Sequence, residues 1–85
     1  MKFTIYGKPG CHFCTQARTL LRTRNIPFTY IDISQDDAAM KFVKEGLQAK
    51  QVPQIMLDNN GIISHVGGYT QLVEYFEEQD MFNDI

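Results

Sequence analysis

Two cysteines carry the reactive chemistry that the sequence suggests. Cys11 and Cys14 form a Cys-x-x-Cys motif between a short strand-like segment and a segment of helical character, and the chain has no other cysteine. This context is typical of a thiol-disulfide redox site. If Cys11 opens the helix, unpaired backbone N–H groups and the positive end of the helix dipole lie near its sulfur and favour the thiolate. Because the thiolate is the attacking species, Cys11 is the predicted nucleophile.

Cys14 lies one helical turn further along the same face, so the two sulfurs can form a small disulfide ring, and we expect Cys14 to be the more buried. A structural zinc site is the first alternative. It needs four ligands, and the remaining candidates are His12, which points differently from Cys11, and His65. We therefore predict no metal site. Two inert helical cysteines are the second alternative, which the position after Gly10 disfavours.

Length and composition indicate the number of domains, the expected location and the classes of partner that can be excluded. A chain of 85 residues, 44% of them hydrophobic, predicts a single domain over residues 1–85 with one modest core. It lacks both an apolar run near the ~20 residues of a membrane span and the apolar region of a signal peptide, so we expect a soluble cytoplasmic protein with no membrane partner. The net charge of −2, with scattered Lys and Arg, argues against nucleic-acid binding. A monomer is the default.

The first part of the chain predicts a β-α-β unit. Residues 2–6 are rich in β-formers and precede a Gly- and Pro-containing loop at 7–10. Residues 11–24 contain no Gly or Pro and repeat apolar side chains at helical spacing. Pro27 follows this helix, and the aromatic and β-branched residues 28–33 predict the second strand.

The second part predicts a helix, a hairpin and a final helix. Ser34 is the predicted N-cap of the first of these helices, which Gly46 weakens or ends. Residues 55–57 and 62–66 flank a strong turn signal at 58–61. Thr70 is the predicted N-cap of the final helix, and residues 80–85 show no clear pattern. The elements together predict an α/β domain, a four-stranded mixed sheet flanked by three helices, which matches the thioredoxin-like architecture.

Core candidates come from all of these elements. They are Phe3, Ile5, Leu20, Leu21, Phe28, Tyr30, Ile31, Ile55, Leu57, Leu72 and Phe76.

From Lys2 to about Phe76 the chain resembles a glutaredoxin of the dithiol type. Four motifs carry the resemblance in their order and spacing: Lys8-x-x-Cys11-x-x-Cys14, Val52-Pro53-Gln54-Ile55, the turn Asn60-Gly61, and Gly67-Gly68-Tyr69. The resemblance implies the thioredoxin-like fold and a cis peptide bond between Val52 and Pro53 beside the cysteines. It also implies glutathione as a co-substrate, with no tightly bound cofactor.

The resemblance further implies a set of glutathione-binding residues. Lys8 and Lys50 would face the glycine carboxylate, and the backbone of Val52, before Pro53, would pair with the cysteinyl part. Phe13 would flank the ligand. Gly68 would allow close backbone approach, and the N–H groups of Tyr69 and Thr70, with the Thr70 hydroxyl, would hold the γ-glutamyl carboxylate.

Three residues depart from the usual family pattern. His12 replaces the usual proline or glycine, Gln51 replaces a threonine, and Gln71 stands where many members have an acidic residue near the glutathione amine. A protonated His12 would favour the Cys11 thiolate, whereas a neutral one would do little. Loss of the acid at Gln71 would weaken glutathione binding or shift the preference toward protein disulfides.

The sequence therefore predicts an enzyme, a glutathione-dependent thiol-disulfide oxidoreductase acting through Cys11 and Cys14. Its expected partners are glutathione and disulfide-bearing proteins such as ribonucleotide reductase. One alternative is a redoxin for ribonucleotide reductase that thioredoxin reductase reduces. A second is a module that binds an iron-sulfur cluster through Cys11 and glutathione, which ranks lower because such glutaredoxins usually lack the second cysteine, here Cys14.

Overall fold

The strands form one mixed sheet, as predicted. The computed structural model describes residues 1–83, and its sheet has the strand order β2-β1-β3-β4. The strands are β1 (Lys2–Gly7), β2 (Phe28–Asp32), β3 (Gln54–Asn59) and β4 (Ile62–Gly67). β1 is parallel to β2 and antiparallel to β3, and β3 is antiparallel to β4. Cys11 follows β1, one of the two inner strands, so the loop that carries it leaves the middle of the sheet.

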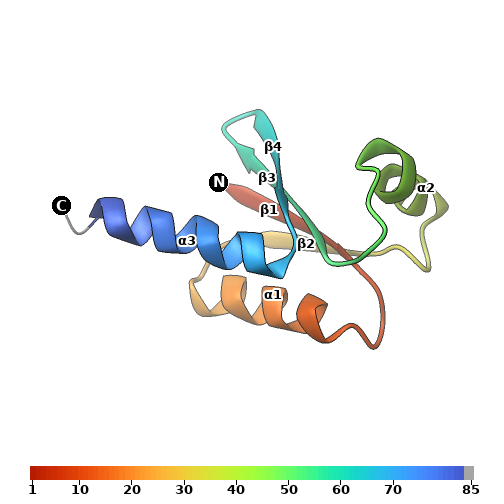
Figure 1. Cartoon of the computed structure of the whole chain (residues 1–85), viewed down its shortest axis with the longest axis horizontal. Helices are drawn as coiled ribbons and strands as arrows, with labels where there is room; N and C mark the ends of the chain where they lie inside the picture. Colours follow the sequence, from red (N-terminus) through yellow and green to blue (C-terminus); the bar gives the residue numbers. More distant parts are fainter. Residues whose placement is uncertain (84–85) are drawn as a thin grey trace.

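Two long helices cover one face of the sheet. Figure 1 shows α1 (His12–Thr23) and α3 (Tyr69–Asn83) side by side on this face, and the two helices share the main core. This core contains Phe3 and Ile5 from β1, Ile55 and Leu57 from β3, Ala17 and Leu21 from α1, and Leu72 and Phe76 from α3. Seven of these eight residues were predicted core residues. Of the other candidates, Leu20, Phe28 and Tyr30 are partly buried against the main core, and Ile31 packs elsewhere.

A shorter helical segment covers part of the opposite face. It consists of α2 (Asp37–Lys41) and the π-helical turn η1 (Phe42–Gly46), and lies apart from α1 and α3 in Figure 1. Ile33, Ala39 and Val43 form a second buried cluster here, with Tyr6 packed against it. Side chains alternate along a strand, so Tyr6 points away from the face that Ile5 buries. The two clusters therefore lie on opposite sides of β1.

The hairpin between β3 and β4 agrees with its turn signal. Asn60 and Gly61 have φ values of +56° and +90°, and the Asp58 carboxylate accepts the N–H of Gly61 at 2.8 Å. Two successive positive φ angles favour an Asn-Gly pair, which matches the twist of the flanking strands.

The prediction of Ser34 as an N-cap was wrong. Asp36 caps α2, since its carboxylate accepts the N–H of Ala39 at 3.0 Å. The Ser34 hydroxyl instead donates to the carboxylate of Asp32 at 2.6 Å, and the Ser34 N–H donates to the same oxygen at 2.9 Å. Ser34 is therefore part of the turn after β2. The helical segment ends at Gly46, as predicted.

The predictions for the last helix also need correction. α3 already begins at Tyr69, so Thr70 lies in its first turn and is not the N-cap. The helix continues to Asn83, through most of the segment 80–85 that showed no pattern; residues 84–85 lie outside the described residues. Arg24, at the end of α1, donates to the Asp80 carboxylate at 2.9 Å and lies 4.4 Å from the ring centre of Phe76. Neither α3 nor any other helix within residues 1–83 combines the length and the apolar character that a membrane span needs.

Candidate active site

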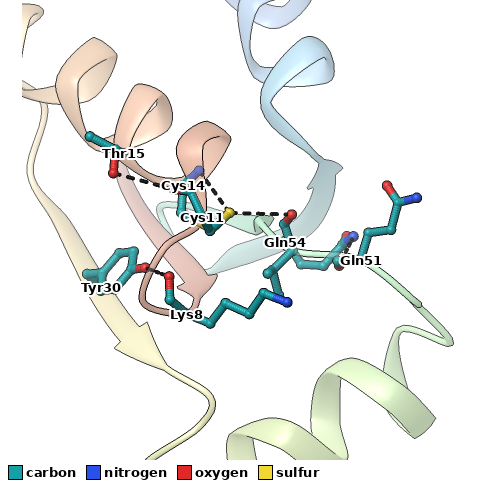
Figure 2. The surroundings of a disulfide bond; sticks show 8 residues. Lys8, Cys11, Cys14, Thr15, Tyr30, Gln51 and Gln54 are labelled. Atoms are coloured by element: carbon teal, nitrogen blue, oxygen red, sulfur yellow. Dashed lines mark hydrogen bonds between the residues drawn. A yellow bond between two sulfur atoms is a disulfide. The ribbon is translucent and has the colours of Figure 1, made fainter.

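The two cysteines lie at the start of α1 and are joined by a disulfide bond (Figure 2). Cys11 is the N-cap residue, with an extended backbone, and its Sγ accepts the N–H of Cys14 at 3.2 Å. Cys11 is partly exposed, whereas Cys14 is fully buried. Both the helix-start position of Cys11 and the greater burial of Cys14 were expected from the sequence. A sulfur in this position faces the positive end of the helix dipole, which favours the thiolate after the disulfide is reduced.

The loop before Cys11 is held by Tyr30 from the neighbouring strand. The Tyr30 hydroxyl donates to the carbonyl oxygen of Lys8 at 3.4 Å, as Figure 2 shows. The Arg18 guanidinium lies 4.2 Å from the centre of the Tyr30 ring. Gly7 has no room for a side chain, since a Cβ there would contact the Tyr30 hydroxyl and lie 2.9 Å from Cys14 Sγ. Tyr30 was predicted only as a core residue, so its role in the site was missed.

The loop before β3 lies against the exposed sulfur. Its Val52–Pro53 peptide bond is cis, as the family resemblance implied. The carbonyl oxygen of Val52 lies 3.7 Å from Cys11 Sγ, and the Gln54 side chain donates to the carbonyl of Gln51 at 2.9 Å. The backbone of this loop is therefore adjacent to the atom that would react with a disulfide.

A first groove runs from this loop to the start of α3. We call it the α3 groove; its volume is about 320 Å³, and it is lined by Phe13, Gln51, Val52, Pro53, Gln54, Gly68, Tyr69, Thr70 and Gln71. The Phe13 ring stacks on that of Tyr69, with centres 5.8 Å apart and planes 24° apart. Gly68 lies close to Pro53, since a Cβ on Gly68 would be 3.6 Å from the Pro53 carbonyl oxygen. Six of the predicted glutathione-binding residues thus lie together.

Gln71 has a local structural role that the sequence did not reveal. Its side-chain oxygen accepts the N–H of Gly68 at 2.9 Å, and the N–H of Leu72 donates to the carbonyl of Gly68. This is half of a capping box, in which the third helical residue satisfies the N–H of the N-cap residue. The sequence signal that could have indicated this bond is a Gln three residues after Gly68.

A second groove lies on the other side of Val52. We call it the lysine groove; it has a volume of about 230 Å³ and contains the two predicted binding lysines, Lys8 and Lys50, together with Lys44. Figure 2 shows the Lys8 side chain extending beneath Cys11 toward the loop that carries Gln51. Gln51 and Val52 line both grooves. Cations thus lie at one end of the combined site and helix N–H groups at the other, with the sulfur between them.

His12 lies beside the α3 groove. Its ring centre is 5.5 Å from that of Phe13, and its Nε2 lies 3.2 Å from the side-chain nitrogen of Gln16, one turn further along α1. His12 therefore extends the aromatic surface formed by Phe13 and Tyr69. Among residues 1–83, no three His, Cys, Asp or Glu side chains form a group that could hold a metal ion.

Comparison with known proteins gives the family. The profile of the Glutaredoxin family matches residues 3–62. This chain belongs to the glutaredoxin family. Glutaredoxin 1 of Rickettsia conorii is 33% identical to it over 76 residues, which covers 87% of this chain and 71% of the relative.

Solved structures of glutaredoxins share the fold. The solution structure of glutaredoxin from Brucella melitensis has a TM-score of 0.74 and 28% identity, and covers 98% of this chain and 86% of that one. The crystal structure of a buckwheat glutaredoxin-glutathione complex has a TM-score of 0.75 over 95% of this chain and 73% of that one, at 18% identity. The thioredoxin-like fold is thus confirmed, and this glutaredoxin is a thiol-disulfide oxidoreductase with Cys11 and Cys14 as its redox-active pair.

Proposed function

We propose that this glutaredoxin uses glutathione to reduce protein disulfides and mixed disulfides of glutathione, with ribonucleotide reductase as one candidate substrate. The observation that carries the proposal is that the lysine groove and the α3 groove meet at Val52. The carbonyl oxygen of Val52 lies 3.7 Å from Cys11 Sγ. Glutathione has carboxylates at both ends and a thiol between them. A site with lysines at one end, helix N–H groups at the other and a reactive sulfur in the middle has the matching arrangement.

The first step is attack by the Cys11 thiolate on one sulfur of the substrate disulfide. A bond forms between Cys11 Sγ and that sulfur, the substrate S–S bond breaks, and the other substrate sulfur leaves as a thiolate that takes a proton from solvent. The N–H of Cys14 donates to Cys11 Sγ at 3.2 Å, and it is positioned to stabilise the negative charge before attack. Cys11 is the partly exposed member of the pair, so it is the one that an external disulfide reaches.

The second step is resolution by Cys14. Its thiolate attacks Cys11 Sγ, the Cys11–Cys14 bond forms, and the second substrate sulfur is released as a thiolate and protonated. The substrate has then gained two electrons from the enzyme and two protons from solvent, and the Cys14 proton has gone to solvent. Because Cys14 is fully buried, its accessible reaction partner is Cys11 and not an external disulfide.

Two molecules of glutathione would restore the dithiol. The thiolate of the first attacks Cys11 Sγ, which breaks the Cys11–Cys14 bond and gives a mixed disulfide between glutathione and Cys11, while Cys14 leaves as a thiolate and takes a proton from solvent. The second attacks the sulfur of the bound glutathione, which releases oxidised glutathione and the Cys11 thiolate. A reducing cytoplasm, with its pool of glutathione, suits this cycle.

The proposed contacts of glutathione follow from the grooves. Lys8 and Lys50 attract the glycine carboxylate, and the backbone of Val52, adjacent to Pro53, pairs with the cysteinyl part in the manner of an added strand. Phe13 flanks the γ-glutamyl part. The backbone of Gly68 leaves space for close approach, and Tyr69 and Thr70 offer N–H groups from the first turn of α3 to the γ-glutamyl carboxylate.

A second candidate keeps the chemistry and changes the reductant to thioredoxin reductase. Gln71 favours it, because this neutral side chain accepts the N–H of Gly68 and offers no negative charge to the glutathione amine. The lysine groove and the Phe13–Tyr69 stack favour glutathione, and on this balance glutathione remains the proposed reductant.

The test measures reduction of a mixed disulfide between glutathione and a small thiol, coupled to glutathione reductase and NADPH. A parallel arm contains thioredoxin reductase and NADPH without glutathione. Turnover in the first arm supports the proposal, and turnover confined to the second arm rejects it in favour of the second candidate.

Two variants test the division of roles between the cysteines. Cys11→Ser is expected to abolish turnover in every assay, because it removes the attacking sulfur. Cys14→Ser is expected to stop reduction of protein disulfides and to retain part of the activity on glutathione mixed disulfides, for which Cys11 suffices. Equal loss of both activities in the two variants would contradict this assignment.

A further inference from the structure

We propose that the lysine groove binds an acidic segment of the protein substrate, in which an aliphatic side chain lies beside one or two carboxylates close to the disulfide. The proposal rests on the proposed function and extends it by naming the class of protein substrate. Its basis is the part of the groove that the glutathione contacts leave unused, namely Lys44 and an apolar floor formed by Ile33, Met40, Val43 and Ala49.

The floor of the groove suits an aliphatic side chain. Ile33 and Val43 are buried, Met40 and Ala49 are half-buried, and Val52 closes the end nearest the sulfur. Grooves with apolar walls and a few polar groups at the edge favour ligands that bury an apolar group and present charge at the rim. The glycine end of glutathione carries a carboxylate and no aliphatic side chain, so it would not use this floor.

The rim of the groove selects negative charge. Three lysines, Lys8, Lys44 and Lys50, line it, and no acidic residue is among its described lining. The chain as a whole has a net charge of −2, so this positive edge is a local feature and not the consequence of a basic protein. Complementary charge across an interface selects partners and accelerates association.

The position of the groove relates it to the reaction. Val52 lines the groove, and its carbonyl oxygen lies 3.7 Å from Cys11 Sγ. An extended substrate that pairs with this backbone alternates its side chains between two directions. Side chains next to the substrate cysteine can then enter the groove while the sulfur meets Cys11.

The far wall of the groove is a π-helical turn. In η1 the N–H of Leu47 donates to the carbonyl of Phe42 at 2.8 Å, and beyond it the N–H of Ala49 donates to the carbonyl of Val43 at 3.0 Å. These bonds fix the positions of Val43 and Ala49 in the floor of the groove. Lys44, which also lines the groove, directly follows Val43. π-helical turns are rare and occur frequently at functional sites.

The test compares synthetic peptides that share one intramolecular disulfide within Cys-Ser-Gly-Cys. The first continues with Leu-Glu-Glu, the second with Leu-Gln-Gln and the third with Ser-Glu-Glu. An exposed ion pair changes an equilibrium by up to about fivefold, so we expect kcat/KM for the first peptide to exceed that for the second by about tenfold. The preference should shrink in high salt. The third peptide should be reduced less efficiently than the first, because it lacks the aliphatic group.

Lys44→Gln and a matched control locate the effect. In Lys44→Gln the preference for Leu-Glu-Glu over Leu-Gln-Gln should fall to about threefold, since one of the ion pairs is lost. Lys41→Gln removes the same charge from an exposed lysine of α2 that does not line the groove, and it should retain the wild-type preference. Equal rates on the two peptides in the wild type, or equal effects of the two variants, would overturn the proposal.

A binding measurement separates this proposal from the proposed function. ¹⁵N-labelled protein is titrated with the Leu-Glu-Glu peptide carrying serine in place of both cysteines, and the amide shifts are followed by NMR. Shifts at Ile33, Lys44 and Ala49 support the proposal even if no glutathione-dependent turnover is found. Shifts confined to Phe13 and Tyr69 in the α3 groove, or no shifts, would contradict it even if the mixed-disulfide assay shows a fully active glutaredoxin.

Discussion

The side chain of Gln71 provides the sharpest test of how the α3 groove is built. Its oxygen accepts the N–H of Gly68 at 2.9 Å, and this N–H precedes the two that are proposed to bind the γ-glutamyl carboxylate. Gln71→Ala removes the acceptor and leaves the N–H to solvent. Gln71→Glu keeps an acceptor in the same place, and a negative charge in the first turn also interacts favourably with the helix dipole.

The magnitude follows from the exposure of this bond. The Gly68–Gln71 hydrogen bond is at the surface, so the loss belongs at the low end of the range for caps and hydrogen bonds, about 0.5–1 kcal/mol in the free energy of unfolding. For a domain of this size, that loss lowers Tm by about 2–8 °C. Gln71→Glu should be at least as stable as the wild type at neutral pH.

The assay is thermal unfolding of the oxidised protein followed by circular dichroism. Gln79→Ala is the matched control, because it makes the same change at an exposed position of the same helix. Its effect should be close to zero or slightly stabilising, since Ala is the better helix former. If Gln71→Ala is as stable as Gln79→Ala, or if Gln71→Glu is as unstable as Gln71→Ala, the capping role is refuted.

The same variants carry a functional readout. A carboxylate at position 71 would stand near the glutathione amine, so Gln71→Glu should lower KM for glutathione in the coupled assay, whereas Gln71→Ala should raise it. A KM that rises in both variants would show that the ammonium group of glutathione does not approach this position.

Two further predictions concern packing and pH. Gly7→Ala should destabilise the protein by about 1–3 kcal/mol in urea unfolding, because the added methyl would lie 2.9 Å from Cys14 Sγ and against the Tyr30 hydroxyl; unchanged stability would mean that this contact is not tight. The hydrogen bond from Arg24 lowers the pKa of Asp80 below its ordinary value of 3.8, so the ion pair stabilises the folded state above that pH and loses its effect as the pH falls through the lower folded-state pKa. Unfolding of Asp80→Asn and the wild type should therefore differ slightly at pH 7 and converge in acid, and a difference that persists in acid would contradict the assignment to the carboxylate.

The sequence predicted those parts of the fold whose signals are local. Alternation of side chains along β1, the Asn60-Gly61 turn and the apolar spacing in α1 each depend on a few consecutive residues. The same holds for Cys11 at the start of its helix, because a Gly-containing loop directly precedes it. The cis Val52–Pro53 bond was predicted from the family resemblance and not from the composition of the loop.

The errors occurred where a distant or competing partner decides the structure. The Ser34 hydroxyl was expected to cap α2, but it donates a hydrogen bond to the Asp32 carboxylate instead. The last turns of α3 lack a clear apolar pattern. Asp80, in these turns, pairs with Arg24, which is 56 positions earlier in the sequence, so no local signal indicates the contact. Of the three lysines in the lysine groove, the sequence analysis named Lys8 and Lys50 but not Lys44. Lys44 belongs to η1, and only the tertiary fold brings it to the same groove.

The difference between the two cysteines shows most clearly how the fold creates function from a short motif. Both belong to one four-residue segment, yet Cys14 is fully buried and Cys11 is partly exposed. Cys14 can be buried because β1 ends in Gly7. Gly7 has no side chain, and this leaves space for the sulfur of Cys14. Cys11, at the N-cap, remains at the junction of the two grooves. A bulkier residue at the end of β1 would displace Cys14, and would thereby disturb the resolving step proposed for it, without any change in the Cys-x-x-Cys sequence.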